Sequence, residues 1–229
     1  MTVAPSLPAA ADVIMSPAGL NATLKKMELL SRQAGSGTPP QRQEALYQIG
    51  VEGDGLAALI NQEVASHGMQ ERELIDLALS RSRELGIIVA YNREKKQFFY
   101  DGAAFESYLK EAPRGSHAAP AHFKLLSYRF YQSTTSDAAS LVESAEAKRQ
   151  FLAQYPRFEE NAELELYLAI DYRDLYRHYR EGRDDANAEK YRALTRSTYQ
   201  RIARLYPRSE QAAAARQLLR RFDEETVRR

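Results

Sequence analysis

The sequence predicts a mainly α-helical fold of antiparallel helical hairpins, with one β-hairpin in a small N-terminal helical domain. Two observations lead to this fold class. Segments with apolar residues at helical spacing fill the chain from Ala103 onward, and prolines stand at the joints between them. One pair of runs rich in β-branched and aromatic residues, at 87–91 and 97–100, is the only strong strand signal in the sequence.

The composition is that of an ordinary globular protein, with 229 residues of which 44% are hydrophobic and 28% are charged. The 32 basic and 31 acidic residues leave a net charge of +1, which disfavours nucleic acid as a partner. Cysteine is absent, which excludes disulfides, thiolate chemistry and cysteine-ligated zinc. No apolar run approaches the roughly 18 residues that a membrane span needs, so we expect none.

Residues 1–40 are expected to form a flexible arm, although 21–33 has the apolar spacing of a short helix. The run Ala9-Ala10-Ala11 before Asp12 is typical of a signal-peptidase site, but no basic segment precedes it. Two interpretations stay open, the remnant of an export signal ending at Ala11 or a plain Ala/Pro tail. The protein would be periplasmic or exported if an upstream signal segment has been removed, and cytoplasmic otherwise.

Residues 41–102 are predicted to form the small helical domain that ends in the β-hairpin. Helical spacing predicts helices over 41–67 and 70–85, the second with Leu74, Leu77, Ala78 and Leu85 inward. A polar five-residue turn joins the two strands. Three glycines are expected to break the first helix: Gly50, Gly53 and Gly55.

Residues 103–229 are predicted to form a helical repeat domain. Its helices are expected at 103–111, 116–132, 139–154, 159–180, 186–205 and 209–226. Three joints between them are similar: Ala112-Pro113-Arg114-Gly115, Tyr155-Pro156-Arg157-Phe158 and Tyr206-Pro207-Arg208-Ser209. Each proline stops one helix, and alanines early in the next helix let the two backbones approach closely.

This pattern of an apolar residue, Tyr-Pro, a small residue and spaced alanines resembles the tetratricopeptide (TPR) repeats of bacterial envelope proteins. These include the outer-membrane β-barrel assembly lipoprotein and the cell-division coordinator with C-terminal repeats. The resemblance covers about residues 103–226 and implies a TPR-like solenoid that serves as a protein–protein scaffold in the periplasm. The prolines are 43 and 51 residues apart, longer than the roughly 34 of a standard repeat, and the lipobox cysteine is missing.

Two sets of residues are candidates for binding a partner protein or peptide. Tyr172, Tyr176 and Tyr179 share one face of a long helix, and would mark a partner groove if exposed. The alternative is that these rings fill the seam between hairpins.

The second set lies on the turn of the β-hairpin: Arg93, Lys95 and Lys96. The order helix, glycine, helix, hairpin over 56–100 is that of a winged helix-turn-helix, so an alternative function is nucleic-acid binding with these cations on the wing. The helix at 70–85 weakens this alternative because Glu71, Glu73 and Asp76 would repel phosphate. A hairpin that only caps the helical array is the third interpretation.

No catalytic, metal or cofactor site is predicted, and the protein is expected to be non-enzymatic. His117 and His122 are five residues apart, which does not place them on one helical face. A Glu cluster at 159–165 is explained by the positive end of the helix dipole. The arginine-rich C-terminal region predicts a solvated surface, with an acidic protein or lipid head groups as alternative partners.

Overall fold

A computed structural model describes residues 15–67, 72–132 and 137–227. Over these ranges the chain is mainly helical with one small antiparallel β-hairpin, as predicted. The chain divides into two compact units, the first ending at Tyr131 and the second beginning at Gln132. The run Ala9-Ala10-Ala11 lies outside the described residues.

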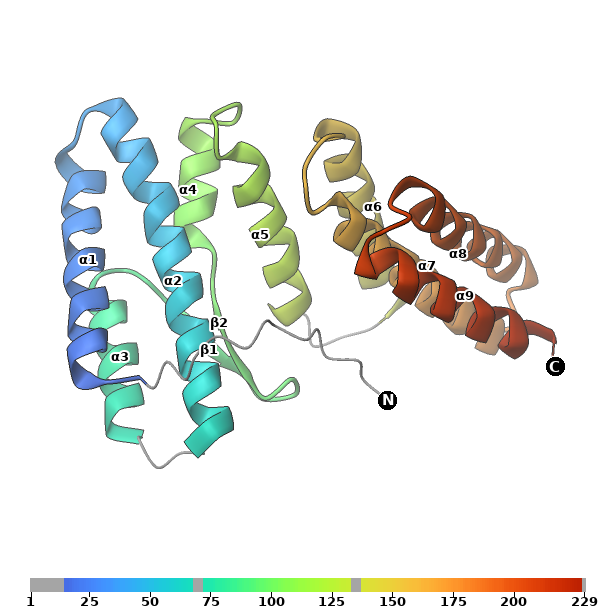
Figure 1. Ribbon diagram of the computed structural model, residues 1–229, viewed down its shortest axis with the longest axis horizontal. Coiled ribbons are helices and arrows are strands. Elements are labelled where there is room, and N and C mark those ends of the chain that lie inside the picture. Colours follow the sequence, from blue (N-terminus) through green and yellow to red (C-terminus); the bar gives the residue numbers. More distant parts are fainter. Residues whose placement is uncertain (1–14, 68–71, 133–136, 228–229) are drawn as a thin grey trace. The chain divides into compact units, whose positions relative to one another are not determined.

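The first unit is organised around one long helix. Its elements are α1 (Pro17–Ser36), α2 (Pro39–His67), α3 (Arg72–Glu84), β1 (Val89–Asn92), β2 (Gln97–Tyr100), α4 (Ala103–Glu111) and α5 (Ala118–Gln132). Helix α2 packs against α1, α4 and both strands (Figure 1). It is therefore the central element of this unit.

The expected flexible arm is wrong for residues 17–36, which form α1 and include the short helix predicted at 21–33. Ser16 caps the helix by accepting a hydrogen bond from the Gly19 N–H at 3.1 Å, and Pro17 stands in the first turn, where proline is favoured. Four apolar side chains at helical spacing are buried: Leu20, Leu24, Met27 and Leu30. Burial of this stripe against α2 orders a segment whose flanking composition predicted an arm.

Helix α2 continues through the glycines that were expected to break it. A Cβ at Gly50 would lie 2.5 Å from Cε1 of Phe105, and one at Gly53 would lie 2.8 Å from Cδ2 of Tyr100. The two glycines therefore give room to aromatic rings from α4 and β2. This packing offsets the low helix propensity of glycine, which the sequence pattern alone could not reveal.

Helix α3 turns the predicted face inward except at Leu77, since Ala78 is buried and Leu74 and Leu85 pack against the core of the first unit. Ile75, Ala78 and Ser82 are buried, whereas Leu77 is 46% exposed. The helix packs against α1 and β1. Residues on the inward face are three and four apart, and Leu77 falls outside that stripe.

The β-hairpin packs against α2, and one α2 side chain also hydrogen-bonds to its backbone. Strand β1 pairs with β2 in the register Val89↔Tyr100 and Tyr91↔Phe98. The Asn61 side chain of α2 accepts a hydrogen bond from the Phe98 N–H at 2.7 Å and donates one to the Phe98 carbonyl at 2.8 Å. Asn61 thus satisfies both backbone groups of Phe98, as a further strand would.

The predicted boundary between domains, at 102/103, also differs from the structure. Phe105 and Tyr108 of α4 and Ala121 and Tyr128 of α5 share a core with α1 and α2. Helices α4 and α5 therefore belong to the first unit rather than to the second, where the sequence analysis placed them. The reason is the close fit of the Phe105 ring over Gly50.

The second unit contains α6 (Ala138–Gln154), α7 (Asn161–Glu181), α8 (Asp185–Leu205) and α9 (Glu210–Val227). Each helix packs against the next, and α7 also contacts α9 (Figure 1). One core joins α6, α7, α8 and Phe222 of α9, and another gathers around Tyr199 and Ile202. The bounds of these four helices match the predicted ones to within two residues.

The three proline joints have one backbone geometry. The residue before each proline ends its helix with φ/ψ of −135°/63° at Ala112, −124°/62° at Tyr155 and −122°/49° at Tyr206. Its carbonyl then accepts a hydrogen bond of 2.9 to 3.1 Å from the N–H three residues on, at Gly115, Phe158 and Ser209 respectively. Proline excludes the helical conformation from the preceding residue, so the similar sequences produce the same turn.

Candidate partner-binding surface

Two of the three candidate tyrosines of α7 lie in the protein interior. Tyr172 is 6% exposed and Tyr176 is 7% exposed. The Tyr172 ring lies 6.0 Å from Tyr191 of α8, and the Tyr176 ring meets Phe222 of α9 edge-on at 5.2 Å. These rings fill the seam between helices, so they are not free to contact a partner.

The third candidate, Tyr179, is half-buried. Its ring stacks on Tyr191 with 5.5 Å between centroids and 1° between planes. Tyr167, on the same helix, is 40% exposed and donates a hydrogen bond to Glu163 at 2.8 Å. The exposed aromatic surface of α7 is therefore at Tyr167 rather than at the predicted positions.

The three cations of the β-hairpin lie on its turn as predicted. Arg93 and Lys96 are exposed, and Lys96 has a left-handed φ of 52°. Lys95 is half-buried, and this burial lowers its pKa. The turn therefore presents positive charge to solvent at the end of the hairpin.

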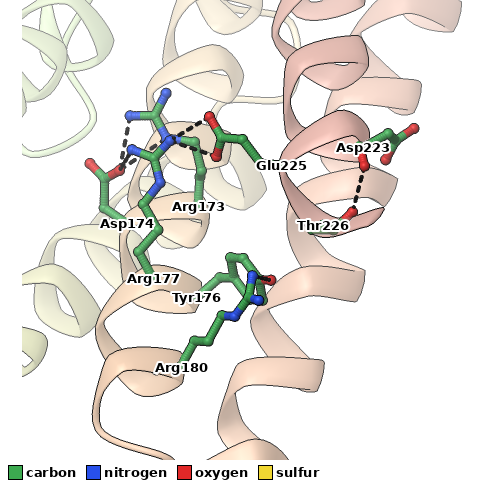
Figure 2. Close-up of polar contacts among 8 residues, drawn as sticks. All are labelled: Arg173, Asp174, Tyr176, Arg177, Arg180, Asp223, Glu225 and Thr226. Carbon is green, nitrogen blue, oxygen red and sulfur yellow. Dashed lines mark hydrogen bonds and ion pairs between the residues drawn. The ribbon is translucent and has the colours of Figure 1, made fainter. Parts of the chain in front are cut away.

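A network of charged side chains joins α7 to α9 and is drawn in Figure 2. Arg173 donates from both Nε and Nη2 to Oδ1 of Asp174, at 3.0 and 2.9 Å. Arg177, one turn later, donates from Nη2 to both oxygens of Glu225, at 3.0 and 2.8 Å. Nη1 of Arg177 lies 3.9 Å from Asp174. Two guanidinium groups thus lie between two carboxylates.

The ion pair between Arg177 and Glu225 is accessible to water. The two side chains are 43% and 50% exposed. One nitrogen of Arg177 serves both oxygens of Glu225, so the pair lacks the two parallel hydrogen bonds of the strongest guanidinium–carboxylate geometry. Exposed pairs of this kind contribute about 0–1 kcal/mol to stability.

The hydroxyl of Tyr199, on α8, is buried close to this network. The Tyr199 side chain is fully buried, and among the described residues its hydroxyl has no hydrogen-bond partner. Burial raises its pKa to about 12, and the charges of Arg173, Asp174, Arg177 and Glu225 also act on it. The hydroxyl therefore stays protonated at neutral pH and is an unused hydrogen-bond donor.

Helices α6 and α7 share a second, more deeply buried polar group. Lys148 donates to Asp171 at 2.6 Å and to Ser144 at 2.5 Å, and the Ser144 hydroxyl donates to Asp171 at 3.0 Å. Burial raises the pKa of Asp171, against the lowering effect of Lys148. The arrangement fits a hydrogen-bonded ion pair between helices.

Over the part of the chain that the structure describes, no group of three or more His, Asp or Glu side chains could hold a metal ion. Within the same residues no helix is long and apolar enough to cross a membrane.

The sequence did not identify the network on α7 and α9. Arg173 and Arg177 are recognisable as an i,i+4 pair, but Glu225 lies 48 positions from Arg177 and only the fold brings them together. Nothing in the sequence distinguishes Tyr199 from the other tyrosines on helical stripes.

A comparison with protein-family models finds no match, and neither does a comparison with the curated proteins.

Proposed function

We propose that this protein is a non-enzymatic scaffold that binds another protein or peptide through the helical hairpins of α6 to α9. The two hairpins would form a short TPR-like solenoid, with α6–α7 as one repeat and α8–α9 as the other. In such an array each repeat contacts its neighbour, and the outer helix faces remain available to partners.

The observation that carries this proposal is the packing of α6 to α9, each helix against the next, together with the shared geometry of the two joints in this unit. Tyr155 and Tyr206 end their helices with nearly the same dihedral angles and the same backbone hydrogen bonds. Two hairpins built in the same way support an array of equivalent units. Tyrosine fills the seams. Arginine, which is enriched at protein interfaces, is exposed at Arg196, Arg204 and Arg220.

Photo-crosslinking tests the scaffold function directly. A photoreactive amino acid would replace one exposed apolar residue at a time in the second unit, at Val142, Tyr167 or Leu205. Leu29 and Leu77 are control positions, because they are also exposed hydrophobic residues but lie in the first unit. We expect one protein to be captured from at least one test position and from neither control position, and to be displaced by excess unmodified protein.

Capture of many proteins to the same extent from all five positions would contradict the scaffold function, and so would capture of none above the background without light.

The cell-envelope location is part of the same proposal and has its own test. It rests on the resemblance of the Tyr-Pro joints to envelope TPR repeats. Fractionation of the native organism would place the protein in the periplasmic fraction, released by osmotic shock together with a periplasmic marker. Retention with a cytoplasmic marker would disprove the envelope location without affecting the scaffold function.

Nucleic-acid binding through residues 56–100 has less support. A helix-turn-helix needs its two helices packed together, whereas α3 packs against α1 and β1. Arg93 and Lys96 supply exposed positive charge, but α3 carries Glu73, Asp76 and Glu84 on its exposed surface. Titration of a labelled duplex across a salt series is expected to show no steep loss of affinity with salt.

A further inference from the structure

The outer end of the β-hairpin, residues 91–98, carries an inference that goes beyond the scaffold function and uses the first unit alone. We call these residues the hairpin tip. We propose that the hairpin tip docks on an anionic lipid surface, with the rings of Tyr91 and Phe98 at the level of the lipid head groups and the cations of the turn against the lipid phosphates.

The first observation is an aromatic pair that continues out of the protein core. Tyr91 and Phe98 are opposite one another in the strand register, and their ring centroids are 4.8 Å apart. The next pair inward on the same face, Val89 and Tyr100, is buried. Phe98 is half-buried and Tyr91 is 48% exposed. This face of the hairpin therefore stays apolar from the core into solvent, and it ends on a ring that is apolar with a polar hydroxyl.

The second observation is positive charge directly beside these rings. The turn between them holds three cations, Arg93, Lys95 and Lys96, against the single carboxylate of Glu94. Arg93 and Lys96 are exposed, one following Tyr91 by two residues and the other preceding Phe98 by two. The hairpin tip thus combines aromatic rings with a net positive charge, which favours an anionic partner.

The third observation is that the tip is held in one conformation. The buried Asn92 side chain accepts hydrogen bonds from the N–H groups of Glu94 and Lys95, both at 3.0 Å. At the other end of the turn, Asn61 of α2 bonds to both backbone groups of Phe98. In Figure 1 the turn lies to one side of α2, clear of the helix ribbons. Docking therefore requires little further ordering of the loop.

The size of the hairpin tip favours a lipid surface over an acidic protein. Two aromatic rings bury about 300–500 Å² even when they are fully covered. A stable protein complex buries roughly 600–1,000 Å² on each partner. A membrane has no such requirement, because each cation near an anionic surface strengthens binding by about fivefold and tyrosine is favoured at the head-group level.

The absence of tryptophan from the chain provides a direct test. Tyr91→Trp places a single fluorescent reporter on the hairpin tip of the full chain. With vesicles of equimolar phosphatidylglycerol and phosphatidylcholine, its emission is expected to shift to the blue and to be quenched by brominated acyl chains. Vesicles of pure phosphatidylcholine are expected to cause neither change. Tyr167→Trp on α7 is the matched control, since Tyr167 is 40% exposed, and its emission is expected to stay the same.

Cosedimentation with the same anionic vesicles tests the cations. The double variant Arg93→Gln/Lys96→Gln is expected to bind about 10- to 25-fold more weakly than the wild type. Arg220→Gln/Arg221→Gln removes two exposed cations from the second unit and is expected to change the affinity by less than about twofold. Both substitutions are at exposed positions, so thermal unfolding of the two variants is expected to match the wild type.

Several outcomes would overturn the inference: no binding of the wild type to anionic vesicles, an equal emission shift with pure phosphatidylcholine, or an equal loss of affinity in the two double variants. Release of the protein from vesicles by hexaglutamate or by oligothymidylate, at an equal concentration of negative charge, would assign the tip to an acidic protein or a single-stranded nucleic acid instead. The scaffold function is tested separately, by photo-crosslinking from the second unit.

Discussion

At the residue scale, two glycines determine how the first unit packs. Gly50 and Gly53 lie on the face of α2 that receives Phe105 and Tyr100, and both rings are almost completely buried. Gly55, only two residues further, has nothing within 4 Å of where its Cβ would be. All three glycines lie in α2 and have the same low helix propensity, but only Gly50 and Gly53 make room for an aromatic ring.

Alanine substitutions test this difference. Gly50→Ala is expected to lower the free energy of unfolding by about 1–3 kcal/mol, because the Phe105 ring must move and this cost exceeds the gain in helix propensity. Gly55→Ala is expected to raise it by about 0.5–1 kcal/mol, since only propensity and chain entropy change there. Urea denaturation followed by circular dichroism measures both. Equal stability of the two variants would show that the ring does not depend on the glycine.

The same residues explain an error of prediction from the sequence. Glycine has low helix propensity, so three glycines in six residues predict a break. The packing partner of Gly50 lies 55 positions away, at Phe105, and no local pattern connects them. Propensity is a weak term that tertiary packing can override, and here it does so at two positions.

At the element scale, local sequence signals were sufficient to predict where the helices of the second unit begin and end. Tyr155-Pro156 and Tyr206-Pro207 contain both the end of one helix and the turn that follows, so the sequence predicted those ends closely. Contacts between helices were not predictable in this way. Asp171 is 23 residues from Lys148, and only the packing of α6 on α7 makes the pair.

That buried pair leads to a prediction about how α6 and α7 are held together. Lys148→Met alone is expected to destabilise the protein by about 3–5 kcal/mol, because it leaves Asp171 buried without its counter-charge. The double variant Lys148→Met/Asp171→Leu removes both charges and is expected to be at least as stable as the wild type, or more stable by about 1–4 kcal/mol. Denaturant titrations of the two variants and the wild type measure the difference. A double variant no more stable than the single one would mean that the ion pair makes a net contribution to stability.

At the scale of the whole molecule, the boundary between the two compact units lies at 131/132 rather than at the predicted 102/103. The helical segments after Ala103 look alike in sequence, and their similar joints favoured a single repeat domain. Ala112 of the first joint and Tyr108, one helical turn before it, nevertheless belong to the core of α1 and α2. The joint geometry is determined locally, by the proline and the Tyr or Ala before it. Which unit a helix belongs to depends instead on where its apolar side chains are buried. The sequence carried the first kind of information and not the second.

The two possible boundaries predict different behaviour of C-terminal fragments. A fragment of residues 132–229 contains the whole of the second unit and is expected to fold alone, with cooperative thermal unfolding. A fragment of residues 103–229 adds α4 and α5 without the helix that covers Phe105, so its backbone amides over 103–128 are expected to exchange with solvent as in an unfolded chain. Hydrogen exchange measured by mass spectrometry on both fragments and on the full chain gives the comparison. Protection of 103–128 in the longer fragment would restore the boundary at 102/103, because α4 and α5 would then be stabilised by the helices of the second unit rather than by α2.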